Sequence, residues 1–219
     1  MKLGLMTMIA GVLLLAGCQS ALNKVGRNAK YNAYEMIGVQ KRDLLKREVA
    51  ATKDDQKEAS EEFKDALEKL KAVYAFDGGD LEREYRRLNS SYEDAEAQAN
   101  AVRLRIKKVE TTAGDLFEEW KKEIDQIETA NLQAQSRKTL ATTQSRYADM
   151  LNSLKKAEST MNPVLTKLKD HVLYLKHNLN AKAIGSLKGE GAAIERDINK
   201  LINEMNNSIA AADKFIEQT

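Results

Sequence analysis

Apolar side chains recur along this chain at alternating spacings of three and four residues. The clearest stretch keeps this spacing without a break at Leu81, Tyr85, Leu88, Tyr92, Ala95, Ala99, Val102, Ile106, Val109, Ala113, Leu116 and Trp120. A 3.5-residue period of this length is typical of a coiled coil, because a straight α-helix repeats every 3.6 residues and would carry the pattern off one face. We therefore predict a long helix over residues 81–128.

Three other segments carry the same spacing and predict helices over residues 41–76, 132–178 and 181–217. The positions in the first are Leu45, Val49, Thr52, Gln56, Ala59, Phe63, Ala66, Leu70 and Val73. Those in the second are Leu140, Gln144, Tyr147, Leu151, Leu154, Glu158, Met161, Leu165, Leu168, Val172 and Leu175. Those in the third are Ile184, Leu187, Gly191, Ile194, Ile198, Leu201, Met205, Ser208, Ala212 and Phe215. Gln144 and Glu158 either set the register of the helices or face water.

The breaks between these segments are short. Residues 77–80 (DGGD) end one helix with glycines, and Asp80 can cap the next. The other breaks lie near residues 129–131 and 178–180. Pro163 does not interrupt the spacing, so we expect one continuous, kinked helix there. Short connections make consecutive helices antiparallel neighbours, and the prediction is an all-α, elongated antiparallel bundle or coiled coil of four long helices over residues 41–219.

The two central helices are predicted to be the longest, on the order of 70 Å against about 55 Å for the outer two. Their hairpin would then project past its neighbours. Apolar residues there are candidates for a partner contact: Trp120, Ile124, Ile127 and Leu132. A second interpretation stays open, in which residues 29–37 form a short helix before Gly38 and cover this patch. Residues 19–28 would be a tether.

The first residues have the layout of a secretory signal peptide. Lys2 precedes an apolar run over residues 3–16, which is too short for a permanent membrane helix. Residues 15–18, Leu15, Ala16, Gly17 and Cys18, resemble the lipobox of bacterial lipoproteins. That resemblance implies removal of residues 1–17 and attachment of diacylglycerol and an N-acyl chain such as palmitate at Cys18, with no other cofactor. The alternative is a plain signal peptide with a chance cysteine. Residues 18–40 then hold the lipidated cysteine, the tether and the short helix.

Composition narrows the classes of function. Charged residues make up 31% of the chain and aromatic residues 5%, as in long helices with charged faces. The net charge of +2 gives no bulk attraction to nucleic acid. Cys18 is the only cysteine, so no disulfide can form within the chain and the fold depends on packing.

Candidate chemistry is sparse. His171 and His177 are six residues apart, on different helix faces, whereas metal ligands on one helix need a spacing of three or four. Asp77 and Asp80 lack the further oxygens that calcium requires. The glycines around Lys188 follow no strand and precede no Gly-Lys-Ser/Thr, which excludes a phosphate loop. We predict no metal site, no small-molecule substrate and no enzyme.

Several stretches resemble the DUF2959 family of uncharacterised bacterial proteins. They are residues 38–44 (GVQKRDL), 76–81 (FDGGDL), 116–120 (LFEEW), 161–165 (MNPVL) and 172–184 (VLYLKHNLNAKAI). The resemblance implies helices and a location in the envelope of Gram-negative bacteria, and it supplies no activity or catalytic residue.

These observations together predict a membrane-anchored protein of the cell envelope. Gln19 after the cysteine favours the outer membrane under the lipoprotein sorting rule, with the bundle facing the periplasm. Its partners would be other envelope proteins or a second copy, and its role structural or scaffolding. The alternative is a periplasmic binding module for cell wall or a regulator of a wall hydrolase.

Overall fold

The computed structural model describes residues 24–36 and 38–219 and contains helices and no strand over those ranges. The all-α class is therefore confirmed. Five helices are present in the described residues rather than four, because a shorter helix over residues 24–36 precedes the four long ones. The chain divides into two compact units, residues 1–44 and 45–219.

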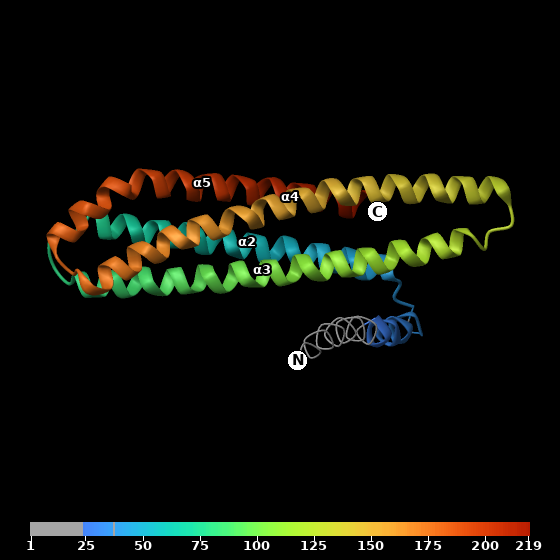
Figure 1. The fold of residues 1–219 in the computed structure, drawn as a ribbon, viewed down its shortest axis with the longest axis horizontal. Helices are drawn as coiled ribbons and strands as arrows, with labels where there is room; N and C mark the ends of the chain where they lie inside the picture. The colour runs from blue at the N-terminus through green and yellow to red at the C-terminus, as the bar shows by residue number, and fades with distance from the viewer. Residues whose placement is uncertain (1–23, 37) are drawn as a thin grey trace, which may run out of the picture. The chain divides into compact units, whose positions relative to one another are not determined.

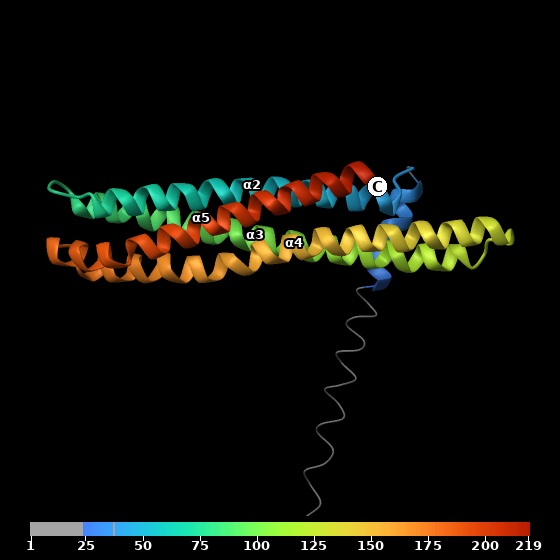
Figure 2. The ribbon, with the colours of Figure 1, turned by 90° about the horizontal axis from the view of Figure 1, so that it is seen from above.

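The four long helices are α2 (Lys41–Tyr74), α3 (Leu81–Ile124), α4 (Ala130–His177) and α5 (Ala181–Gln218). Residues 45–219 form an elongated bundle in which consecutive helices run antiparallel (Figures 1 and 2). The predicted ends agree to within a few residues, except that α3 stops at Ile124 rather than 128. The chain turns there, with the amide of Ile127 donating to the carbonyl of Ile124 at 3.2 Å.

Ion pairs and hydrogen bonds join each helix to its neighbours around the bundle. Arg105 of α3 pairs with Asp55 of α2 at 2.9 Å, and Arg103 of α3 pairs with Glu158 of α4 at 2.7 Å. Lys156 of α4 reaches Glu204 of α5, and α5 returns to α2 through Asp213 and Lys53. The contacts run in sequence order and close the ring, as expected for an up-down-up-down bundle.

The core follows the predicted spacing closely in α2 and α5. Every predicted position from Leu45 to Val73 and from Ile184 to Phe215 is buried. Ile202 and Ile216 are partly buried and pack against the core beside the α5 positions, so this helix presents a broad apolar face. Burial of such side chains stabilises by about 1.5–3 kcal/mol each, which explains how a fold with no disulfide holds together.

The predicted spacing in α4 needs correction at three positions, Gln144, Leu151 and Glu158. Met150 and Ala157 are buried, whereas the predicted Leu151 and Glu158 beside them are only half-buried. Thr143 is likewise buried beside the half-buried Gln144, whereas the predicted Leu165 and Val172 are buried together with the residues that precede them. Each of the three corrections moves the buried position to the preceding residue and leaves the heptad period unchanged. Glu158 lies on the flank, where it accepts a hydrogen bond from Arg103, so it belongs to the inter-helix surface.

A smaller correction applies near the end of α3. Phe117 is buried there, and the predicted Leu116 is half-buried. The Phe117 ring meets the ring of Tyr147 on α4 edge to face, with centroids 5.4 Å apart. This aromatic contact is worth about 0.5–1.5 kcal/mol beyond area burial, which favours Phe117 as the inward residue.

Continuous helix through Pro163 is confirmed, and Gly114, a second residue with poor helix propensity, also lies inside a helix. Helix α4 passes through Pro163, which is exposed. Ser159, whose carbonyl loses its partner at Pro163, is exposed too, so water can satisfy that carbonyl and the break is avoided. Helix α3 likewise passes through Gly114.

One buried polar pair interrupts the apolar core of the bundle. The hydroxyl of Ser208 on α5 donates to the side-chain oxygen of Gln56 on α2, and both residues are fully buried. The amide nitrogen of Gln56 has no hydrogen-bond partner among the described residues. Such a pair costs stability but matches the two helices at one register only.

The N-terminal unit has its own local order. A turn at Gly38, whose φ of +80° favours glycine, lies between the helix over residues 24–36 and α2. The amide of Gly38 donates to the carbonyl of Glu35, and the Lys41 ammonium pairs with the Glu35 carboxylate at 2.8 Å. The helix begins earlier than predicted, so residues 24–28 are helical rather than a tether.

Candidate interaction surfaces at the bundle ends

The α3–α4 hairpin extends past the C-terminal end of α5 (Figures 1 and 2). Arg146 of α4 donates to the carbonyl of Gln218 at 3.0 Å, which places the end of α5 beside residue 146. The sixteen residues of α4 before that point therefore continue for about 24 Å beyond α5. We call residues 117–146 the hairpin tip.

Aromatic rings close the base of the hairpin tip. Tyr147 contacts Phe117 on one side and Phe215 of α5 on the other, with ring centroids 5.4 and 6.2 Å apart. Burial raises the pKa of the Tyr147 hydroxyl, and the nearby Glu110 carboxylate raises it further. The hydroxyl therefore stays protonated, and the ring packs as a neutral group between the two helix pairs.

The four residues predicted as a partner contact all lie in this tip but differ in exposure. Leu132 is 54% exposed, whereas Ile124 is 2% exposed and belongs to the core. Trp120 is half-buried, packs against the core and donates its indole N–H to the hydroxyl of Ser136 on α4 at 3.1 Å. Ile127 is also half-buried. Ile124 is therefore a correction to the expectation of an uncovered patch, and Leu132 is the residue most available to a partner.

The opposite end carries a second group of exposed apolar side chains. Leu173 and Tyr174 at the end of α4 are 48% and 39% exposed, and Leu179 in the α4–α5 turn is 39% exposed. Large exposed apolar residues are few in the described residues, and these three lie within seven positions. The heptad spacing did not predict this group, because the predicted core positions near it are Val172 and Leu175 and none of the three exposed residues.

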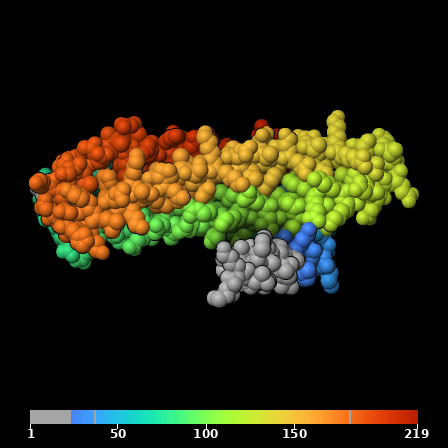
Figure 3. Space-filling view, viewed as in Figure 1, coloured from blue at the N-terminus to red at the C-terminus, as the bar shows by residue number. Residues whose placement is uncertain are grey.

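The chain around these residues is basic. Between Asp170 and Glu190 it contains Lys176, Lys182 and Lys188 and no acidic residue. All three lysines are exposed, and none forms an ion pair with the residues described. In Figure 3 the orange α4–α5 segment occupies the extreme of the bundle at this end. We call Leu173, Tyr174, Lys176, Leu179 and Lys182 the α4–α5 patch.

Buried aromatic residues lie close to this patch. His171 is buried on α4, with its Nδ1 2.9 Å from the carbonyl of Lys167, and its ring meets Tyr74 of α2 at 6.2 Å between centroids. Gly191 of α5 lets Tyr74 approach, since a Cβ there would lie 2.6 Å from the ring. Burial raises the pKa of the Tyr74 hydroxyl, with a further increase from Glu190. His177 is exposed, so the two histidines do not meet.

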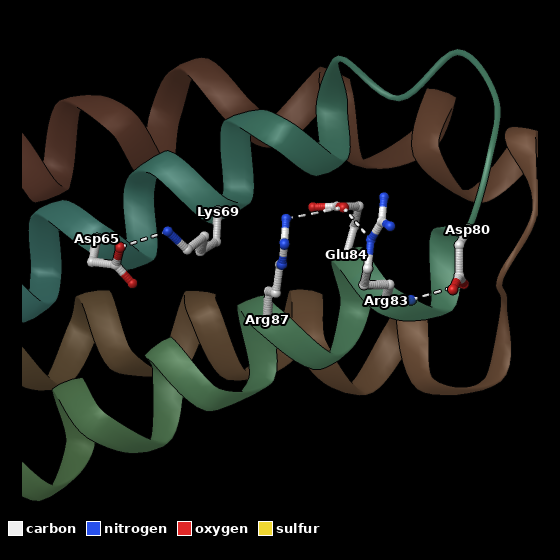
Figure 4. Close-up of polar contacts among 6 residues, drawn as sticks. All are labelled: Asp65, Lys69, Asp80, Arg83, Glu84 and Arg87. Atoms are coloured by element: carbon white, nitrogen blue, oxygen red, sulfur yellow. Dashed lines mark hydrogen bonds and ion pairs between the residues drawn. The ribbon is translucent and has the colours of Figure 1, made fainter.

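The adjacent α2–α3 turn is built differently. Gly78 and Gly79 have φ angles of +158° and +109°, and the Asp80 carboxylate caps α3 by accepting from the amide of Arg83 at 3.0 Å. Figure 4 shows the charges that follow: Glu84 accepts from both Arg83 and Arg87. Asp80 therefore caps α3 as predicted, and Glu84 is paired with two arginines, unlike the lysines of the α4–α5 patch.

A further polar contact joins α2 and α3 near this turn. Lys69 and Ser91 donate to Asp65 at 2.7 and 2.6 Å, and Figure 4 shows the Lys69 contact. Burial alone would raise the pKa of Asp65, but these two hydrogen bonds outweigh it and the pKa is lowered. Asp65 therefore has a structural role between α2 and α3, and its carboxylate oxygens already accept from these two donors.

Other site classes find little support in residues 24–36 and 38–219. No group of three or more His, Cys, Asp or Glu side chains there could hold a metal ion. None of the described helices combines the length and apolar character needed to cross a bilayer. The predicted lipid attachment at Cys18 and its motif of Leu15, Ala16 and Gly17 lie outside the described residues.

Comparison with known proteins identifies the family. The model of DUF2959, a family of proteins of unknown function, matches residues 30–219. The chain belongs to this family. No curated protein and no solved structure matches it. The match covers both candidate surfaces and all four long helices of this DUF2959 protein and begins after Cys18, so it carries no statement about the lipid.

Proposed function

We propose that this chain is a lipid-anchored scaffold of the bacterial cell envelope that contacts other envelope proteins through its hairpin tip. The observation that carries the proposal is the paired extension of α3 and α4 beyond α5, which holds Leu132 exposed at the end of a bundle held by a continuous core. A rigid element of this kind supports binding by holding its contact residues in place. We propose a non-catalytic role for it.

The anchor supports the envelope part of this proposal. Cys18 follows an apolar run and small residues, as a lipid attachment site requires, and two or three acyl chains give lasting membrane attachment. Gln19 favours the outer membrane, with the bundle in the periplasm. Membrane association through lipid is consistent with helices that do not span a bilayer in the described part of the chain.

Changing Cys18 tests the anchor. We expect Cys18→Ser to move the protein out of the membrane fraction of Gram-negative cells, as measured by fractionation after a salt wash. Gln19→Asp is the matched control, because it keeps the acceptor thiol and should stay with membranes. A Cys18→Ser protein that remains membrane-bound after its signal peptide has been removed contradicts lipid anchoring.

A photo-crosslinking residue placed at Leu132 tests the partner surface in intact cells. We expect adducts with envelope proteins or with a second copy of the chain, and none from the same probe at Lys57, an exposed position in the middle of α2. Adducts only with purified cell wall would replace the scaffold by the alternative, a wall-binding module or hydrolase regulator. Equal adducts from both positions contradict a contact at the hairpin tip.

A further inference from the structure

We propose that the α4–α5 patch is a docking surface for an anionic lipid bilayer. This inference does not depend on lipidation of Cys18, because it concerns a surface of the helical bundle that lies at the end away from the hairpin tip. It adds a second membrane contact to the proposed scaffold. The argument combines the apolar side chains, the sign of the charge and the position of the patch in the bundle.

The apolar side chains suit the boundary between headgroups and acyl chains. Leu173 and Leu179 present aliphatic surface, and Tyr174 combines an apolar ring with a polar hydroxyl. Aromatic residues with one polar end are favoured at membrane interfaces for this reason. Isolated exposed apolar residues need no explanation, but three within seven positions at one end of a charged bundle do.

The charge of the patch selects an anionic surface. Lys176 lies between Tyr174 and Leu179 in the sequence, Lys182 follows Leu179, and Lys188 is six residues further along α5. A basic residue near an anionic leaflet adds attraction that salt screens within a Debye length. Lysines also extend their apolar stems along the surface while their ammonium groups remain in water. A partner surface without negative charge would gain no electrostatic attraction from these unpaired lysines.

Acidic groups at the same end limit the orientation. Asp77, Asp80 and Glu82 belong to the α2–α3 side of the end, where Asp80 caps α3 and Glu82 pairs with Arg86. Asp170 lies one turn before Tyr174 on α4. An anionic bilayer is therefore met by the edge formed by the α4–α5 turn, with the α2–α3 turn tilted away from it.

Vesicle binding tests this proposal. The probe is the lipid-free chain of residues 19–219, which is suitable because residues 45–219 form a compact unit with their own core. We expect it to sediment with vesicles of phosphatidylcholine and phosphatidylglycerol in equal parts and not with phosphatidylcholine alone. Raising the salt concentration from about 0.05 to about 0.5 M should release it.

Two variants of the patch separate its contributions. Lys176→Glu combined with Lys182→Glu should weaken binding at least tenfold. Leu173→Asp leaves both lysines in place and should also weaken binding. Leu104→Asp is the matched control for the apolar change, since Leu104 is a single exposed leucine on α3. Lys57→Glu with Lys200→Glu is the control for charge, because both lysines are exposed elsewhere on the bundle.

The result that supports the proposal is anionic-specific binding that the patch variants lose and the control variants keep, with unchanged circular dichroism. Absence of binding to anionic vesicles overturns it, and so does equal loss in patch and control variants. The Cys18→Ser fractionation reports on the anchor alone, so failure of either proposal is distinguishable from failure of the other.

Discussion

Glu62 of α2 shows how one side chain can work against the fold at neutral pH. Burial raises its pKa above the ordinary 4.5, and the nearby carboxylates of Asp94, Asp65 and Glu58 raise it further. The folded protein therefore holds this proton more tightly than the unfolded chain does. Glu62 favours folding at low pH, and that advantage is lost as the pH rises through the raised pKa.

We expect Glu62→Gln to stabilise the protein at pH 7 by up to about 0.5 kcal/mol, a value kept small because the site is partly exposed to solvent. The gain should vanish near pH 3, where the wild-type side chain is protonated in both states. Urea unfolding at the two pH values measures it. Glu61→Gln, at an exposed position that pairs with Lys64, serves as control and should give no gain.

Substitution of Trp120 is expected to lower the stability of the protein, and substitution of Leu132 is expected to leave it nearly unchanged. Trp120→Ala removes core packing and the hydrogen bond to Ser136, so it should cost about 2 kcal/mol of unfolding free energy. Leu132→Ser removes an exposed side chain and should change stability by less than about 0.5 kcal/mol. Denaturant unfolding compares them. An unchanged midpoint for Trp120→Ala would mean that the indole is not held between α3 and α4.

The sequence predicted buried residues well where only one apolar candidate stood at each heptad position. It was less successful in α4, where Met150 adjoins Leu151 and either apolar residue fits the period, and where the spacing was carried through Glu158 although Ala157 beside it is the apolar residue. Neighbouring residues on a helix differ by about 100° in direction, and either choice preserves a 3.5-residue period. The partners across the interface decide between them, and those partners are known only after folding.

Helices α3 and α4 show why residues with poor helix propensity did not prevent a correct prediction of the helices. The heptad positions stay in phase across Gly114 and Pro163, so the apolar face is continuous even where local propensity is poor. Tertiary packing supplies most helix stability in proteins, and it overrides such local preferences. The end of α3 was missed by four residues, because Ile127 keeps the apolar spacing although the chain has already turned.

Two glycines of α5 provide an opposed pair of predictions at the scale of the helix. Gly191→Ala should destabilise by about 1–3 kcal/mol despite the better helix propensity of alanine, because its Cβ would lie 2.6 Å from Tyr74. Gly189→Ala meets no atom within 4 Å and should stabilise by about 1 kcal/mol. Thermal unfolding reports both signs. A stabilising Gly191→Ala would show that Tyr74 moves aside at little cost.

At the scale of the whole molecule, the length of α4 sets a lower limit on size. Its 48 residues extend for about 72 Å. We therefore expect solution scattering of residues 19–219 to give a maximum dimension of at least about 70 Å. A distribution of interatomic distances that ends well below this value would contradict an unbroken α4.

The two candidate surfaces were not equally accessible to prediction from sequence. The hairpin tip followed from helix lengths, which periodicity gives directly. The α4–α5 patch did not, because Leu173 and Leu179 are ordinary apolar residues in sequence, and only the fold shows that no helix covers them. The prediction for Ile124 was wrong in the opposite direction, since the helix-length argument placed it in an exposed patch and the fold buries it.

The extension beyond α5 separates the reach of this protein from its stability. Adding seven residues to α3 and seven to α4 within the hairpin tip would move the turn outward by about 10 Å and leave every contact of the four-helix region unchanged. Relatives could thus vary in span by whole heptads while sharing the same core. The tip acts as an adjustable spacer, and selection can change its length without the core having to be rebuilt.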